Sequence, residues 1–73
     1  MNQREIKIDK KYRHFKGNEY QVLHLARHSE TMELMVVYRA LYDDYGIWVR
    51  PLDMFLEQVE INGHFINRFE ELE

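Results

Sequence analysis

Apolar and polar positions divide the chain into short extended segments separated by turns. The segment YRHF (12–15) is followed by the turn KGN, and EYQVLHLARH (19–28) then runs extended to the polar stretch SET. The segment ELMVVYRALY (33–42) returns and is dense in the β-branched and aromatic side chains that favour strands. No helical period is sustained between residues 19 and 50. The first half of the chain therefore predicts short strands joined as hairpins.

The second half of the chain predicts a short strand, a helical turn and a final hairpin. IWVR (47–50) follows the turn DDYG and ends at Pro51. One helical turn is expected near Pro51, because proline suits the first position of a helix. Asn62-Gly63 is the preferred pair for a type I′ turn, so EQVEI and HFINRF predict a hairpin around it. Five or six strands at this spacing indicate an all-β barrel or sandwich.

Both faces of the hairpin formed by residues 19–28 and 33–42 are rich in apolar side chains. A sheet open to water on one side shows clean alternation, so this hairpin is predicted to be covered on both sides over part of its length. A small, strongly bent barrel provides such cover. If the residue numbers of paired residues add up to a constant even number (an even pairing sum), Arg27 can lie opposite Glu33 as an opposite-charge pair. One face holds Tyr20, Val22, Ala26, Leu34, Val36, Tyr38 and Ala40, and the other holds Leu23, Leu25, Met35, Val37 and Leu41.

The length of the chain indicates one small domain. A chain of 73 residues buries only part of its unfolded surface, about 60 to 65%. The aromatic share of 14% supplies the large buried areas that a small core needs. We expect residues 1–11 to form a polar N-terminal arm, in which Ile6 and Ile8 would pair as an edge strand, and residues 12–73 to form a single barrel domain.

Composition and charge exclude several kinds of site and argue against some classes of protein. The chain has no Cys, which rules out disulfides, thiolate zinc sites and Cys nucleophiles. Its longest apolar run is short and its amino end is polar, so we expect a soluble cytoplasmic protein without membrane contact. Residues 1–16 are basic and residues 53–73 are acidic, which suits solvated ends. Nucleic-acid modules usually have a high pI, and the value near 5.8 argues against one here.

The stretch LARHSET (25–31) raises the question of catalysis. It resembles the Arg-His-Gly-Glu signature of the histidine phosphatase superfamily, in which the histidine accepts the phosphate. Those enzymes are much longer α/β domains, Ser29 replaces the glycine, and no predicted helix follows to present backbone N–H groups to an anion. We therefore expect His28 to mark a strand end and a polar loop, and the chain not to be an enzyme.

The four histidines invite a metal site that the spacing does not support. His24 and His28 on one strand would lie about 13 Å apart, which is too far for one metal ion. A site would need histidines from different strands together with a carboxylate. We expect no metal and no cofactor.

Binding is the function that the side chains favour. Rings and arginines at strand ends and in loops dominate binding hot spots. Trp48 is flanked by Ile47 and Val49, which face the opposite way, so either Trp48 or that pair is expected nearer to solvent. In the alternative arrangement, Trp48 closes the core and nearby acids hold the arginines. The predicted ligand-binding residues are Tyr12, His14, Arg39, Tyr45, Trp48 and Arg50.

Two classes of partner fit such a surface. A protein or peptide would seat on exposed tyrosine and tryptophan rings, whereas RNA or another polyanion would be gripped by the basic amino arm and the arginines. The acidic balance of the chain favours the protein or peptide. Salt separates the two classes, because a polyanion contact weakens steeply as counterions compete.

A resemblance extends over nearly the whole chain, from Tyr12 to about Phe69. The chain resembles a set of short prokaryotic proteins catalogued as domain of unknown function 1653, which implies an SH3-like β-barrel and no assigned activity. The sequence departs from its relatives at Met32, where glycine is common, so the loop there is expected to differ in turn type. The residues that carry the resemblance are Tyr12, His14, Phe15, Gly17, Ala26, Arg27, His28, Thr31, Glu33, Val37, Tyr38, Arg39, Ala40, Leu41, Trp48, Val49, Arg50, Pro51, Met54 and Phe55.

Overall fold

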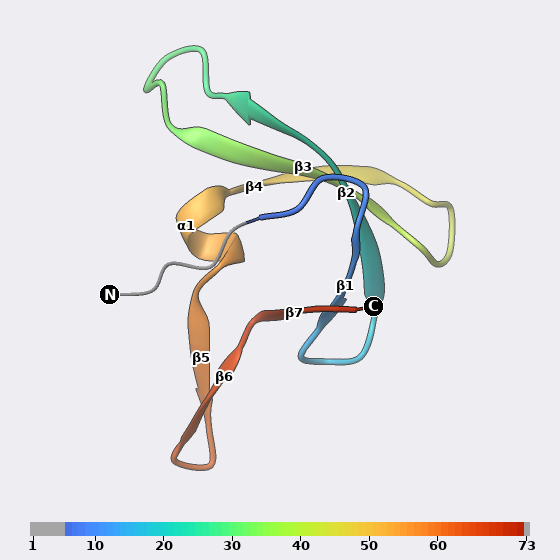
Figure 1. The fold of residues 1–73 in the computed structure, drawn as a ribbon, viewed down its shortest axis with the longest axis vertical. Helices are drawn as coiled ribbons and strands as arrows, with labels where there is room; N and C mark the ends of the chain where they lie inside the picture. Colours follow the sequence, from blue (N-terminus) through green and yellow to red (C-terminus); the bar gives the residue numbers. More distant parts are fainter. Residues whose placement is uncertain (1–5, 73) are drawn as a thin grey trace.

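The computed structural model describes residues 6–72 and shows an all-β fold with one short helix (Figure 1). The predicted all-β class and the helical turn after Pro51 are therefore confirmed. The elements are β1 (Lys11–His14), β2 (Glu19–Arg27), β3 (Leu34–Ala40), β4 (Ile47–Pro51), α1 (Leu52–Phe55), β5 (Gln58–Ile61), β6 (His64–Asn67) and β7 (Phe69–Glu71).

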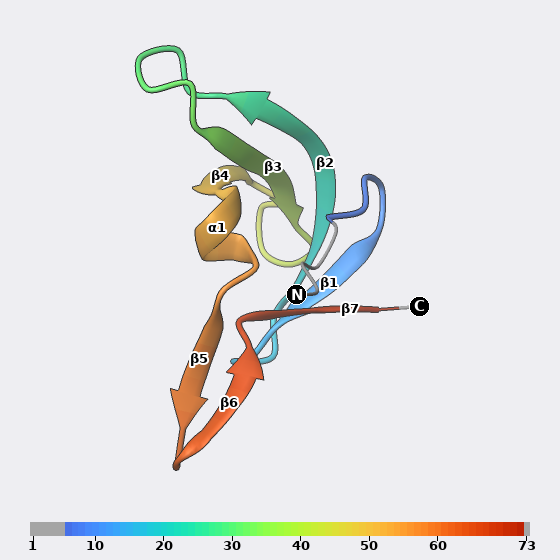
Figure 2. The ribbon, with the colours of Figure 1, turned by 60° about the vertical axis from the view of Figure 1, so that its left-hand side comes forward.

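The strands form a curled five-stranded antiparallel sheet and a separate two-stranded hairpin. The order in the sheet is β4-β3-β2-β1-β7, and β5 pairs only with β6. The sheet bends around α1 as a small SH3-like barrel would, but β4 and β7 remain its two edges (Figures 1 and 2). The described part of the chain has seven strands rather than five or six. The difference arises at Arg68, where the last predicted strand divides and β7 turns to pair with β1.

The register of the central hairpin contains a bulge that the sequence analysis missed. Tyr20 pairs with Ala40 as the even pairing sum requires, but the register shifts by one residue between Val22 and His24. The expected pair of Arg27 with Glu33 is therefore wrong, since Arg27 lies opposite Leu34. A bulge adds one unpaired residue to one strand and bends it.

The bulge also changes which side chains face the core. Beyond it, Leu25 shares a face with the buried Val36, and Ala26 moves to the opposite face, where it is exposed together with His24. The predicted cover on both sides over part of the hairpin does not extend to that outer end of β2. The described residues place no element over it, and it extends away from the body of the domain (Figure 1).

An aromatic core holds the small sheet together. The rings of Phe55 and Phe69 stack with centroids 4.0 Å apart, and Tyr12 meets Phe55 edge-on at 5.4 Å. Edge-to-face and stacked rings add attraction beyond the area that they bury. Phe55 is the buried residue of α1, so the helical turn after Pro51 serves to place this ring under the sheet. The buried cluster is Tyr12, Val22, Val36, Tyr38, Phe55 and Phe69.

The chain before β1 packs on the core at Ile6 and is bonded to β2 at Asp9 and Lys10. Ile6 packs on the core cluster, and the Asp9 N–H donates to the Val22 carbonyl oxygen at 2.8 Å. Ile8 is exposed. Residues 1–5 of the predicted arm lie outside the described residues, and the boundary at residue 12 stays a prediction. A search of the described residues finds no helix long and apolar enough to cross a membrane.

Two of the turns that contain left-handed residues bear on the sequence predictions. Asn62 and Gly63 have φ of 53° and 81°, the pair of positive values that a type I′ turn requires, so the predicted hairpin is confirmed. Met32 has φ of 65° in the loop after β2. Glycine adopts this conformation freely, whereas methionine is strained in it.

Candidate binding surface on strand β4

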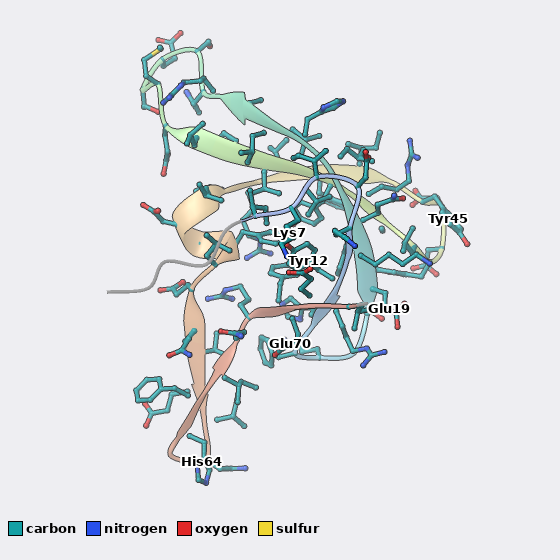
Figure 3. All side chains as sticks on the ribbon, in the orientation of Figure 1. Lys7, Tyr12, Glu19, Tyr45, His64 and Glu70 are labelled. Atoms are coloured by element: carbon teal, nitrogen blue, oxygen red, sulfur yellow. The ribbon has the colours of Figure 1, made fainter. Side chains whose placement is uncertain are left out.

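The six residues predicted to bind a ligand do not form one surface. Tyr12 is a core residue with 1% of its surface exposed, and its hydroxyl accepts a hydrogen bond from the Lys7 N–H at 3.1 Å. Figure 3 shows Tyr12 inside the molecule and Tyr45 at the tip of the loop between β3 and β4. Arg39 pairs with Ile47, whereas Trp48 pairs with the buried Tyr38, so Arg39 lies on the other face of the sheet. We therefore leave Tyr12 and Arg39 out of the candidate surface.

Strand β4 presents three consecutive apolar side chains to solvent. The exposed fractions of Ile47, Trp48 and Val49 are 56%, 59% and 60%. The sequence analysis expected either Trp48 or its two neighbours to be exposed, and both are. The reason is that β4 is an edge strand, so its side chains have a strand neighbour on one side only.

No strand among residues 6–72 pairs with the outer backbone edge of β4. The Ala40 N–H donates to the Gly46 carbonyl oxygen at 2.9 Å and closes the β3–β4 hairpin. Because bonded and non-bonded pairs alternate in an antiparallel ladder, Trp48 and Arg50 turn their backbone groups toward β3. Ile47 and Val49 then turn their N–H and C=O groups toward the open edge.

Proline at the end of β4 agrees with this alternation. Pro51 follows Val49 by two residues and therefore also has its nitrogen on the open edge, where the missing N–H removes no bond to β3. Proline is one of the residues that limit pairing at exposed edges. It leaves Ile47 and Val49 free to pair with another strand.

Arg50 lies beside Trp48 on the face of β4 that continues into the core. Its Nε donates to the Tyr38 hydroxyl at 3.3 Å, and its guanidinium carbon lies 5.5 Å from the centroid of the Phe69 ring. The alternative in which acids hold Arg39 and Arg50 is not what residues 6–72 show. The ion pairs found there are Lys7–Glu71, Arg13–Glu19 and Arg68–Glu57.

His14 reaches the same ring from strand β1. Its imidazole lies 4.9 Å from the Phe69 ring, edge-on, and 4.5 Å from the ring of Phe15. Burial lowers the pKa of His14 from its ordinary value, and the positive charges of Arg50, Arg68 and Lys16 lower it further. His14 is therefore mainly neutral at pH 7.

Two tyrosines form a hydroxyl pair in which Tyr20 interacts electrostatically with Arg50, and the sequence analysis did not select either as a site residue. The Tyr20 and Tyr42 hydroxyl oxygens are 2.8 Å apart. Burial and the hydrogen bond with Tyr42 raise the pKa of Tyr20 to about 12, while Arg50 opposes that rise. The signal for this pair was the register, since Tyr20 opposite Ala40 places Tyr42 just beyond, on the same face.

His28 organises the loop after β2. Its Nδ1 accepts hydrogen bonds from the backbone N–H groups of Glu30 and Thr31, at 3.1 and 3.3 Å. The backbone N–H of His28 donates to the Glu33 carbonyl oxygen, and the backbone carbonyl oxygen of His28 accepts from the Met32 N–H, both at 2.8 Å. LARHSET is thus the end of a strand and a turn closed by the histidine.

The fold and the surface together define a small antiparallel β domain with a free edge strand that carries tryptophan and arginine. Residues 10–71 match the profile of a family described as "Protein of unknown function (DUF1653)". The chain belongs to this family, which confirms the resemblance found in the sequence.

A solved structure supports the same assignment. The chain is similar to the crystal structure of a DUF1653 protein from Bordetella bronchiseptica, with a TM-score of 0.79 and 38% sequence identity. The similarity covers 88% of this chain and 85% of that chain. A search of curated proteins found no match.

Proposed function

We propose that this domain is a non-catalytic binding module that recognises an extended segment of a protein or peptide by strand addition to β4. The observation that carries the proposal is the free edge of β4, with Ile47, Trp48 and Val49 all exposed along it. In strand addition, main-chain hydrogen bonds supply affinity and alternate side chains supply specificity.

The chemistry of β4 suits this mode of recognition. The backbone groups of Ile47 and Val49 offer two donors and two acceptors to an incoming strand. Trp48 adds a large ring, the residue type most enriched in binding hot spots. Natural proteins usually carry features that block pairing at an exposed apolar edge strand, unless the edge binds a partner. In β4, Pro51 blocks pairing only at the end of the strand.

A polyanion fits the described surface less well than a peptide. Lys7, Arg13 and Arg68 already form ion pairs with glutamates. A polyanion would have to compete with those carboxylates for these three cations. Trp48 and its apolar neighbours would contribute little to a contact with a phosphate backbone.

Selection from a random decapeptide library, followed by fluorescence titration, tests the proposal. Trp48 is the single tryptophan, so its emission reports on the proposed surface directly. We expect the selected peptides to shift the emission to shorter wavelength as the indole leaves water, and Val49→Pro to abolish binding because it removes an outward N–H.

Matched variants identify the surface. Phe65→Ala removes another exposed ring, 66% exposed on β6 outside the main sheet, and should leave peptide affinity unchanged. Trp48→Ala, followed by calorimetry, should weaken binding by about 2 kcal/mol or more. Equal affinities for the wild type and Trp48→Ala would refute the proposal. So would selective binding of polyuridylate that falls steeply with salt, in place of any peptide.

A further inference from the structure

We infer that Arg50 and the aromatic side chains around it form a binding site for a single carboxylate group. We call this the Arg50 site and define it by Arg50, His14, Tyr20, Tyr38 and Phe69. The inference rests on the proposed function in one respect only, since a bound peptide is the natural source of the carboxylate. The site itself can be tested with a small acid alone.

Among residues 6–72, the guanidinium of Arg50 is held in place without a counter-ion. The side chain is half-buried, its Nε is bound to the Tyr38 hydroxyl, and the Phe69 ring lies against it. The structure assigns its two terminal nitrogens no hydrogen bond to any of residues 6–72. A partly buried cation without an acidic partner carries a desolvation cost that a bound anion would offset. A planar guanidinium with both terminal nitrogens free matches a carboxylate in two parallel hydrogen bonds.

The Phe69 ring fixes where the guanidinium lies. One face of this ring stacks on Phe55 at an interplanar angle of 4°. Tyr38 and Tyr20 meet it edge-on, with centroids 5.8 and 5.7 Å away. A ring held by three aromatic neighbours is a rigid support, so Arg50 loses little further freedom when it binds a ligand.

The net charge of the site selects a carboxylate over a phosphate dianion. Arg68 is already neutralised by Glu57 at 3.1 Å, and His14 is mainly neutral because its pKa is lowered. Arg50 is thus the one unpaired full charge among the five residues that define the site, since the ammonium of Lys16, which also acts on His14, lies over the Phe15 ring. One positive charge balances one carboxylate, whereas a phosphate dianion would remain partly uncompensated. The hydroxyl of Tyr20 stays protonated at neutral pH and can act as an additional donor.

The position of the site places the carboxylate next to the free edge. Trp48 and Arg50 lie on the same face of β4, about 6.6 Å apart along the strand. A peptide that pairs with Ile47 and Val49 would therefore bring either an acidic side chain or its own C-terminal carboxylate to Arg50. Both sources offer the same chemical group.

N-acetylglycine is the probe for the site, and N-acetylglycinamide is its uncharged match. Each is titrated into ¹⁵N-labelled protein at constant ionic strength while the Arg50 Nε–H signal and the His14 imidazole are followed. We expect saturable shifts with the acid and none with the amide. The pKa of His14 should rise when the acid binds, because the bound anion offsets the positive potential of Arg50.

Variants separate the Arg50 site from general charge effects. Arg50→Gln should lower the affinity for N-acetylglycine by about tenfold or more. This is the loss expected for a charged hydrogen-bonded pair. Arg39→Gln is the matched control, since Arg39 also lacks an ion pair among residues 6–72 but lies on the other face, and it should change the affinity by less than about twofold. If the NMR spectrum shows that Arg50→Gln does not fold, Arg50→Lys takes its place. Lysine cannot form the two parallel hydrogen bonds, so the affinity for N-acetylglycine should still fall.

Three results would overturn the inference. They are equal shifts with the amide, equal weakening by Arg39→Gln, and tighter binding of inorganic phosphate than of N-acetylglycine. The selected peptides show whether Arg50 binds an acidic side chain or the C-terminal carboxylate. Amidation of the C-terminus and Glu→Gln substitution each remove one of these two groups. Peptides without any carboxylate still test strand addition at β4, so failure of the Arg50 site and failure of the proposed function give different results.

Discussion

Met32 adopts a conformation that glycine would adopt more easily. Its φ of 65° lies in the left-handed region, and the side chain is 61% exposed, so it makes little packing contact to offset the strain. The left-handed region costs a non-glycine residue about 1 to 2 kcal/mol. Met32→Gly should therefore raise the free energy of unfolding by about 1 kcal/mol after the added freedom of the unfolded chain is subtracted. Urea unfolding followed by circular dichroism measures the change.

Alanine is the matched control at this position. Met32→Ala removes the same exposed side chain but keeps a Cβ and hence the strain, so we expect it to leave the stability nearly unchanged. A gain from Met32→Ala equal to that from Met32→Gly would show that the side chain, not the backbone, is responsible.

His14 should make the stability depend on pH. Burial, then Arg50, Arg68 and Lys16, place its folded pKa below the unfolded value near 6.5. Between these two values the unfolded chain binds more protons than the folded one. The contribution of His14 is therefore complete above pH 6.5 and is lost as the pH falls through the folded pKa. Urea unfolding at a series of pH values should show less loss in His14→Gln than in the wild type.

The electrostatic part of this effect has its own check. Arg50→Gln removes the largest of the charges that lower the pKa of His14, so the imidazole should titrate at higher pH in that variant when it is followed by NMR. An unchanged pKa of His14 would mean that Arg50 does not lie beside it in solution.

At the residue scale, the sequence offered exposure of Trp48 as one of two alternatives but did not predict the burial of Tyr12. Alternation along β4 defines faces, and the position of Pro51 agrees with an edge strand. Tyr12 looked like a surface ring because it precedes a turn. It is buried because β1 lies between β2 and β7 in the sheet, and β7 pairs with β1 from far along the chain.

At the scale of the element, the β5–β6 hairpin should behave as a nearly independent unit. It pairs with no other strand among the described residues and projects from the domain in both views (Figures 1 and 2). An isolated two-stranded hairpin is marginally stable in water, so its turn matters. Gly63→Ala meets no neighbouring atom but forces alanine to φ of 81°, which should destabilise the hairpin by about 1 kcal/mol.

Amide hydrogen exchange resolves whether this effect is local. Amides of β5 and β6 should exchange roughly fivefold faster in Gly63→Ala, the factor that corresponds to about 1 kcal/mol. Amides of β2 and β3 are the internal control and should keep their rates. Equal acceleration in both hairpins would contradict the independence of β5 and β6.

The hairpins were predictable because their signals are local. Asn62-Gly63 specified its turn, and the apolar segments on either side of LARHSET specified the central hairpin. The bulge at Leu23 was not predictable, since the side-chain pattern of β2 fits either face. Burial of Val22 and Val36 on one face requires the register that the structure shows.

At the scale of the whole molecule, alternation and turn spacing predicted an all-β domain, whereas the order of strands in the curled sheet depends on contacts distant in sequence. Pairing of β1 with β7 joins residues near the two ends of the chain. No local pattern encodes the open edge of β4, because an edge strand is defined by the strand that fails to pair with it. This edge is the basis of both proposals.

Backbone amide exchange at β4, with and without a selected peptide, tests the central claim most directly. In the free protein, the amides of Ile47 and Val49 point away from β3 and should exchange rapidly, while those of Trp48 and Arg50 should be protected. A saturating peptide should protect Ile47 and Val49 and leave the other two as they were. Protection of Val49 in the free protein, or its continued rapid exchange in the complex, would contradict strand addition at β4.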